Sequence, residues 1–127
     1  MMRVLPLILL VALSSACSPA FDFLVYNASA ATVEVFGYET RCTAAPRTAC
    51  AASGGTLRVV RGDRAMVFQP HAFDLFRVSE SRLSAPRLVR LRFDGDRLLV
   101  VAPKDESWTA LAEQPRGFPL PPQDDRR

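Results

Sequence analysis

Apolar and polar side chains alternate in short runs from residue 21 onward, which is the pattern of β-strands with one buried face. The clearest run spans residues 88–93, where Arg90 and Arg92 share one face and three apolar side chains share the other. Further runs predict strands at 21–27, 32–38, 56–61, 65–69, 73–79 and 98–101. A short helical segment is indicated over residues 105–113.

About seven short strands with regular turns predict an all-β fold, either an antiparallel β-sandwich or a small barrel. The pattern does not distinguish these two architectures. A chain of 127 residues is long enough for one hydrophobic core and too short for two. Residues 21–114 are therefore expected to form a single β domain. Prolines and a charged end predict a flexible Pro-rich tail over residues 115–127.

Two of the predicted turns contain residues that also occur in binding motifs. Residues 61–63, Arg-Gly-Asp, resemble the integrin-adhesion motif, and residues 94–96, Asp-Gly-Asp, carry two carboxylates. Gly and Asp are favoured in tight turns on conformational grounds. Two carboxylates are also far fewer than the roughly six to eight oxygens that Ca²⁺ prefers. Both segments are interpreted as hairpin turns. Residues 27–29, Asn-Ala-Ser, match the N-glycosylation pattern and begin at the last residue of the first predicted strand.

Residues 1–16 have the three parts of a secretory signal peptide. Arg3 gives a positive start, residues 4–13 form an apolar run, and residues 14–16 have the small side chains that signal peptidases require. The apolar run is shorter than the roughly 18–20 residues that a membrane-spanning helix needs. We therefore expect residues 1–16 to be removed and the rest of the chain to be exported.

The leader ends in Leu13-Ser14-Ser15-Ala16-Cys17, which resembles the lipobox of bacterial lipoproteins. The resemblance covers only the leader, and Leu13 lies one position further from the cysteine than the favoured leucine. It implies that the Cys17 thiol receives a diacylglyceryl group and that its new amino group is acylated, for example by palmitate. Residues 17–20 would then form a lipidated anchor and a short tether to a cell-envelope membrane, facing the periplasm.

The residue after the cysteine bears on which membrane is reached. In the resembled family, the absence of an aspartate at the position of Ser18 implies transfer to the outer membrane rather than retention at the inner membrane. An alternative to lipidation stays open, because Ser14 and Ala16 also satisfy the small-x-small rule of the general signal peptidase. In that case the protein would be secreted without an anchor.

With Cys17 used for the lipid, two cysteines remain in the exported part of the chain. Cys42 and Cys50 form an even pair, and such pairs normally close into a disulfide in an oxidising compartment. A loop this short would stabilise the fold by roughly 2–3 kcal/mol. A redox or metal pair is disfavoured, because the spacing is not C-x-x-C and no second ligand pair lies nearby in the sequence.

The small net charge and the absence of common catalytic motifs argue against nucleic-acid binding and against catalysis. The net charge is only +3, and acidic residues are scattered among the arginines, so we expect no nucleic-acid partner. The common catalytic motifs are absent, and His71 is the single histidine, interpreted as a surface residue in a turn. We therefore assign no catalytic residue, metal ligand or cofactor, although carboxylate pairs leave glycoside chemistry as a remote alternative.

Exposed arginines are the best functional candidates that the pattern offers. Arg90 and Arg92 alternate with apolar residues and would lie on an exposed strand face. Arg58, Arg87 and Arg97 are expected to lie on exposed strand faces and edges as part of the same candidate surface. The hypothesis is that this surface docks an acidic partner or an anionic glycolipid. The competing interpretation is that these charges serve solubility and prevent edge pairing between strands.

The sequence thus predicts a non-enzymatic, lipid-anchored envelope protein that binds or scaffolds another envelope component. The alternative is a periplasmic inhibitor or a small-ligand-binding lipoprotein. A ligand binder needs a concave apolar pocket, whereas a protein that binds another protein needs an exposed complementary surface.

Overall fold

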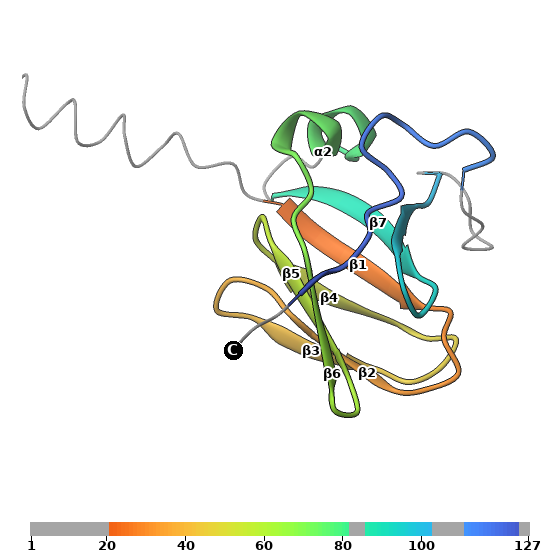
Figure 1. The fold of residues 1–127 in the computed structure, drawn as a ribbon. Helices are drawn as coiled ribbons and strands as arrows, with labels where there is room; N and C mark the ends of the chain where they lie inside the picture. Colours follow the sequence, from red (N-terminus) through yellow and green to blue (C-terminus); the bar gives the residue numbers. More distant parts are fainter. Residues whose placement is uncertain (1–20, 82–85, 103–110, 125–127) are drawn as a thin grey trace, which may run out of the picture.

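A computed structural model describes residues 21–81, 86–102 and 111–124 as two β-sheets that pack face to face (Figure 1). The four-stranded sheet has the order β4 (Ala49–Ser53), β1 (Phe21–Asn27), β7 (Arg87–Phe93) and β8 (Leu98–Val100). The five-stranded sheet has the order β3 (Arg41–Ala44), β2 (Val33–Phe36), β5 (Leu57–Arg61), β6 (Arg64–Phe68) and β9 (Gln123–Asp124). The all-β prediction is confirmed, and of its two architectures the chain adopts the sandwich.

Most neighbouring strands are antiparallel, as predicted, but the two central strands of the four-stranded sheet are not. β1 and β7 run parallel, with Phe21 beside Arg87 and Asn27 beside Phe93. Between these two strands the chain passes through the whole sequence from β2 to α2, most of which lies in the other sheet (Figure 1). A connection of this length removes the need for the hairpin geometry that makes sequential strands antiparallel.

The core lies between the sheets and follows the predicted alternation. Every second residue of β1 is buried, and β7 buries Val89, Leu91 and Phe93. The opposite sheet contributes Val35, Leu57, Val59, Met66 and Phe68. The Phe68 and Phe93 rings meet edge-to-face across the core, with 6.2 Å between their centroids, an arrangement that adds to the apolar burial.

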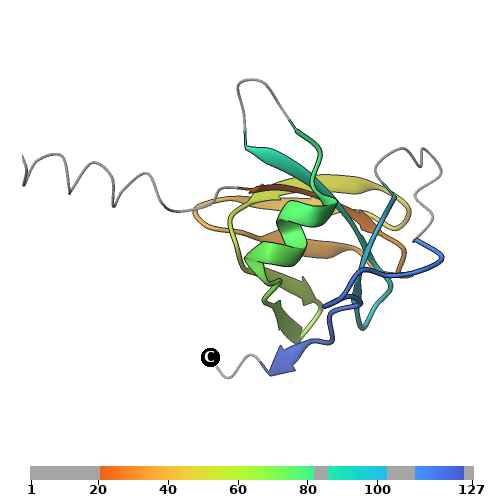
Figure 2. The same cartoon turned by 90° about the horizontal axis from the view of Figure 1, so that it is seen from above.

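The strand predicted at 73–79 is wrong, because this segment forms the helix α2 (Ala72–Val78). Pro70 lacks an amide hydrogen for the sheet, and the exposed His71 then acts as the N-cap, its Nδ1 accepting a hydrogen bond of 3.3 Å from the Phe73 amide. Leu75 and Val78 are three positions apart and both pack on the core, as one face of a helix requires. Figure 2 shows α2 lying beside the sandwich rather than within a sheet.

Two further expectations differ from the structure. β3 and β4, which flank the cysteine loop, were not predicted as strands, because their alanines, threonine and arginine give little apolar alternation. The tail expected at 115–127 is packed over residues 115–124, since Phe118 is buried, Leu120 pairs with Leu98, and β9 pairs with β6.

Several predictions fall outside the described residues. These are the signal peptide at 1–16, Cys17 with its tether to residue 20, and most of the helical segment at 105–113. In the described ranges, the structure has no helix whose length and hydropathy would carry it across a bilayer.

Candidate functional site

The outer face of the five-stranded sheet carries an aromatic ring between two arginines. Phe36 points away from the core because its neighbour Val35 points into it. In the strand register, Arg41 of β3 lies opposite Phe36 on one side and Arg58 of β5 lies opposite it on the other. The Arg58 guanidinium carbon lies 5.6 Å from the centre of the Phe36 ring, within cation–π range. We call Arg41, Phe36 and Arg58 the Arg–Phe–Arg row.

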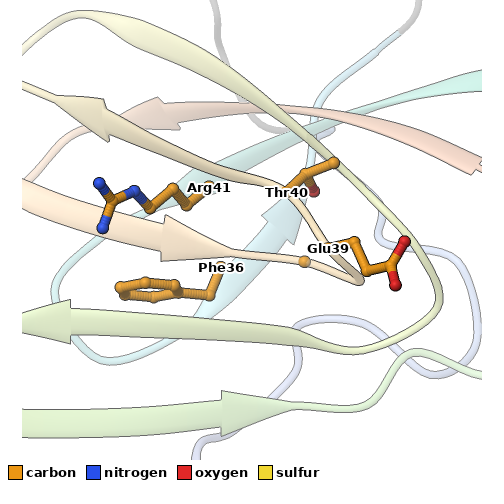
Figure 3. Close-up of a pocket in the computed structure, with 5 residues that line it drawn as sticks. Phe36, Glu39, Thr40 and Arg41 are labelled. Carbon is orange, nitrogen blue, oxygen red and sulfur yellow. The ribbon is translucent and has the colours of Figure 1, made fainter.

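A hollow open to solvent lies beside this row. Its volume is about 390 Å³, and it is lined by Phe36, Gly37, Glu39, Thr40 and Arg41. Figure 3 shows the Phe36 ring and the Arg41 side chain extending in the same direction from adjacent strands, with the Glu39 carboxylate at the other end of the hollow. The hollow therefore presents a guanidinium and an aromatic face on one side and a carboxylate on the other.

The β2–β3 turn, which lines the hollow, is fixed by local hydrogen bonds. The Gly37 amide donates to the Thr40 carbonyl at 2.9 Å, and the Tyr38 amide donates to the Ser53 carbonyl at 2.8 Å. The Ser53 amide in turn donates to Thr40 Oγ1 at 2.9 Å. These bonds tie the β2–β3 turn to the end of β4 and so fix the backbone on one side of the hollow.

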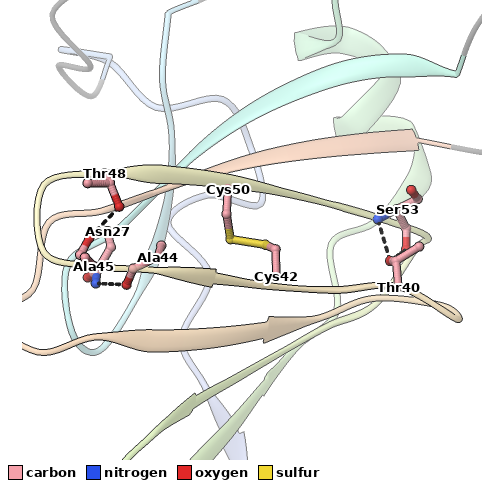
Figure 4. The surroundings of a disulfide bond; sticks show 8 residues. All are labelled: Asn27, Thr40, Cys42, Ala44, Ala45, Thr48, Cys50 and Ser53. Carbon is pink, nitrogen blue, oxygen red and sulfur yellow. Dashed lines mark hydrogen bonds between the residues drawn. A yellow bond between two sulfur atoms is a disulfide. The ribbon is translucent and has the colours of Figure 1, made fainter.

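The predicted disulfide between Cys42 and Cys50 is confirmed, with 5.8 Å between the two Cα atoms. It joins β3, at the edge of the five-stranded sheet, to β4, at the edge of the four-stranded sheet (Figure 4). Arg41 precedes Cys42 on β3. The bridge therefore holds in place the strand that carries one arginine of the Arg–Phe–Arg row.

The arginines grouped from the sequence lie on different faces. Arg90 and Arg92 share the outer face of the four-stranded sheet, as the alternation predicts, whereas Arg58 is on the opposite sheet. Arg90 Nε lies 3.0 Å from Glu80 Oε1, and only 25% of the Arg90 side chain is exposed. Arg97 pairs with Asp94 at 2.9 Å. The proposed contact at Arg90 and Arg92 stays a prediction, with Arg90 held by its carboxylate neighbour.

Both motif-like turns adopt the conformations expected of hairpins. Residues 61–64 connect β5 to β6, and Gly62 has a φ of 60°, a conformation that favours glycine. In the 94–97 turn, Asp94 Oδ1 accepts hydrogen bonds of 2.9 and 2.7 Å from the amides of Asp96 and Arg97. Its carboxylate is thus used within the turn. In the described part of the chain, no group of three or more His, Cys, Asp or Glu side chains is placed to hold a metal ion.

Asp94 has a perturbed ionisation. Partial burial by itself raises the pKa of this carboxyl, but the two amide hydrogen bonds and the Arg97 guanidinium together outweigh it and bring the pKa below its ordinary value of 3.8. The charged form is the one that accepts these bonds. The lowered pKa is therefore a property of the turn.

Comparisons with protein-family models, with curated proteins and with solved structures gave no match for this chain. Sequence reasoning missed Arg41, because β3 was not predicted, and Phe36, because its run was interpreted only as a strand. The signal that was available is the phase of 33–36, which places Phe36 opposite the buried valines.

Proposed function

We propose that the protein is a non-enzymatic, lipid-anchored component of the bacterial cell envelope that binds an acidic segment of another envelope protein through the Arg–Phe–Arg row. The observation that carries this proposal is the cross-strand alignment of Arg41, Phe36 and Arg58 beside an open, shallow hollow. Arginine and aromatic side chains are enriched at the centres of protein interfaces. The anchor is supported by the leader and by Cys17 in its lipobox-like context.

The chemistry of the row favours a carboxylate-bearing partner. Arg41 is exposed on an edge strand, and a guanidinium presents several donors in a plane that matches a carboxylate. The Phe36 ring adds a partly exposed apolar surface between the two cations. Glu39, at the far end of the hollow, would repel an acidic group there and so fix the orientation of the bound segment.

The shape of the site favours a protein over a small molecule. Small-ligand sites enclose most of the ligand surface, whereas this hollow is open and lies on a sheet face. A polypeptide can place one side chain in such a hollow and extend across the neighbouring strands. We therefore rank a protein partner above the small-ligand alternative, and we propose the outer membrane as the location.

A site-specific crosslinker in intact cells tests the partner surface. A photoreactive residue at Thr43, which is exposed on β3 and leaves the row intact, is expected to give one discrete crosslinked product. Arg41→Glu should abolish this product, because the reversed charge repels an acidic partner. Arg47→Glu, the same change at an exposed turn residue on the other end of β3, should preserve it.

A matched probe separates the two candidate faces. A photoreactive residue at Ala51, exposed on the outer face of the four-stranded sheet, should give no product that depends on arginine. A product from Ala51 that is lost in Arg92→Glu, together with none from Thr43, would transfer the binding role to the Arg90 and Arg92 face. Incorporation of labelled palmitate, and its loss in Cys17→Ala, tests the anchor separately.

A further inference from the structure

Exposed aromatic side chains gather at one end of the sandwich. Among the described residues, the large apolar side chains that are exposed are Tyr38 (75%), Phe73 (72%) and Phe76 (47%). Tyr38 lies in the turn after β2, and the two phenylalanines lie on α2. Exposed aromatic residues gathered in this way mark an interaction site more often than single scattered ones do.

Contacts with the start of β1 place all three at the same end. The Phe76 and Phe21 rings are 5.0 Å apart in an edge-to-face arrangement. The Gly54 amide donates to the Phe21 carbonyl at 3.0 Å, and the neighbouring Ser53 carbonyl accepts from the Tyr38 amide at 2.8 Å. Figure 1 shows α2 and the start of β1 together, away from the β5–β6 turn. We call this the aromatic end of the sandwich.

The opposite end has a different character. It is formed by the turns at 61–64 and 94–97, which are rich in charged residues. Arg64 and Asp96 join these two turns through an ion pair of 3.2 Å. The two ends of the sandwich therefore differ. Exposed aromatic side chains lie at the end where β1 begins, and charged turns lie at the other end.

The position of the proposed anchor determines which end of the sandwich lies near the membrane. Cys17 lies four positions before Phe21, and four residues span at most about 14 Å when fully extended. A lipid on Cys17 would therefore hold the aromatic end within this distance of the membrane. We propose that the aromatic end rests on the phospholipid surface, with Tyr38 and Phe73 in the interfacial layer; this inference rests on the lipid anchor of the proposed function.

Two arginines beside the aromatic residues fit a phospholipid surface, whereas the turn that carries Tyr38 also has the exposed carboxylate of Glu39. Arg77 is exposed in the last turn of α2, and the Arg87 guanidinium lies 5.4 Å from the centre of the Phe76 ring. Aromatic rings favour the headgroup region of a bilayer, and nearby arginines interact with phosphates. Asp74, on the same helix, is half-buried and less accessible than Arg77. The combination of apolar rings with flanking cations is typical of interfacial helices.

The inference also adds an orientation to the proposed function. With the aromatic end on the bilayer, the sheets stand away from the membrane and the charged turns face the periplasm. The hollow beside the Arg–Phe–Arg row starts at the β2–β3 turn that carries Tyr38. The proposed partner site would then lie close to the membrane, within reach of a membrane-embedded protein.

Lipid-dependent quenching of a fluorophore tests this orientation. The full lipidated protein is reconstituted in vesicles of phosphatidylethanolamine and phosphatidylglycerol that contain a spin-labelled lipid as quencher. A fluorophore is attached to the thiol of Phe73→Cys or, as the matched control, of Asp63→Cys in the exposed β5–β6 turn. Several-fold stronger quenching at position 73 than at position 63 is expected, together with a shift of the position 73 emission to shorter wavelength.

Mass spectrometry of the same samples distinguishes a wrong orientation from a missing lipid anchor. If the acyl groups are present on Cys17 and the two positions are quenched equally, the orientation is wrong while the anchored protein of the proposed function stands. If no lipid is present on Cys17, both proposals fall. A second label at Tyr38→Cys guards against misfolding of the helix variant and should be quenched as strongly as position 73.

Discussion

The side-chain oxygen of Asn27 accepts two hydrogen bonds from Ser29, one from its hydroxyl at 2.6 Å and one from its amide at 3.0 Å. Asn27 Nδ2 donates to the carbonyls of Ala31 and Ala44 at 2.8 and 2.9 Å. Asn27 is fully buried, so its carboxamide uses its hydrogen-bonding capacity inside the protein. The Asn-Ala-Ser sequence therefore has a structural use, which is to tie the end of β1 to β3.

Asn27→Asp should destabilise the protein by about 2–4 kcal/mol, because an acceptor oxygen would replace the donor that faces two carbonyls. Ser29→Ala removes the single hydroxyl proton that Asn27 Oδ1 and the Ala31 carbonyl share and should cost only about 1 kcal/mol. Urea unfolding followed by circular dichroism measures both values. Equal and small effects for the two variants would mean that this buried network contributes little to stability.

The disulfide predicts a second stability effect. The double variant Cys42→Ala and Cys50→Ala should lose about 2–3 kcal/mol of unfolding free energy, because the reduced chain regains loop-closure entropy when unfolded. Chemical reduction of the unaltered protein should give a similar loss. The variant should also weaken the Thr43 crosslink, since β3 loses its tie to β4. An unchanged unfolding midpoint would show that the two sheets hold β3 without the bridge.

The lowered pKa of Asp94 predicts that the stability of the fold depends on pH. Because its pKa in the folded protein is below the ordinary 3.8, the charged carboxyl stabilises the fold above about pH 4, and this contribution is lost as the pH falls through the lower, folded-state pKa. Asp94→Ala should cost about 1 kcal/mol at neutral pH, a small value because solvent screens a turn at the surface. Unfolding at a series of pH values should show a flatter acid limb for this variant.

A side chain at Gly37 should destabilise the protein by steric collision, and Gly55 provides a matched control. A Cβ at this position would collide with the Ser53 carbonyl oxygen and approach Thr40 Oγ1 to 2.8 Å. Gly37→Ala should therefore destabilise the protein by about 1–3 kcal/mol and distort the hollow. Gly55→Ala meets nothing within 4 Å and should change the unfolding free energy very little. Thermal unfolding of the two variants makes the comparison, which equal stabilities would contradict.

The strands that could be predicted from the sequence are those with strong alternation. β7 is an example, because its inward valine, leucine and phenylalanine leave one consistent phase. The segment at 73–79 resembles a strand because Phe73 and Leu75 mimic a period of two, although the fold uses the spacing of Leu75 and Val78. β3 and β4 carry little apolar signal, and their pairing depends on partners far away in the sequence.

In the candidate site, too, the features that could be predicted lie within one segment, and those that could not depend on pairing between segments. Arg90 and Arg92 were found because they alternate within one strand, and the pairing of Cys42 with Cys50 followed from their number and compartment. The Arg–Phe–Arg row combines three strands, so its formation depends on the register between them. No pattern within a single segment of sequence contains that register.

Substitution of Phe118 tests whether the carboxy-terminal segment packs against the core in solution. This ring is 8% exposed and belongs to the core, although the prolines around it predict a loose tail. Leu120 supports its position through reciprocal backbone hydrogen bonds with Leu98 at 2.8 and 3.1 Å. Phe118→Ala should therefore cost about 3–4 kcal/mol, the value of a truncated core phenylalanine, whereas Arg116→Ala, at an exposed position two residues earlier, should cost less than about 0.5 kcal/mol. Urea unfolding gives both values. A loss at Phe118 as small as that at Arg116 would mean that this segment is loose in solution, as its composition predicts.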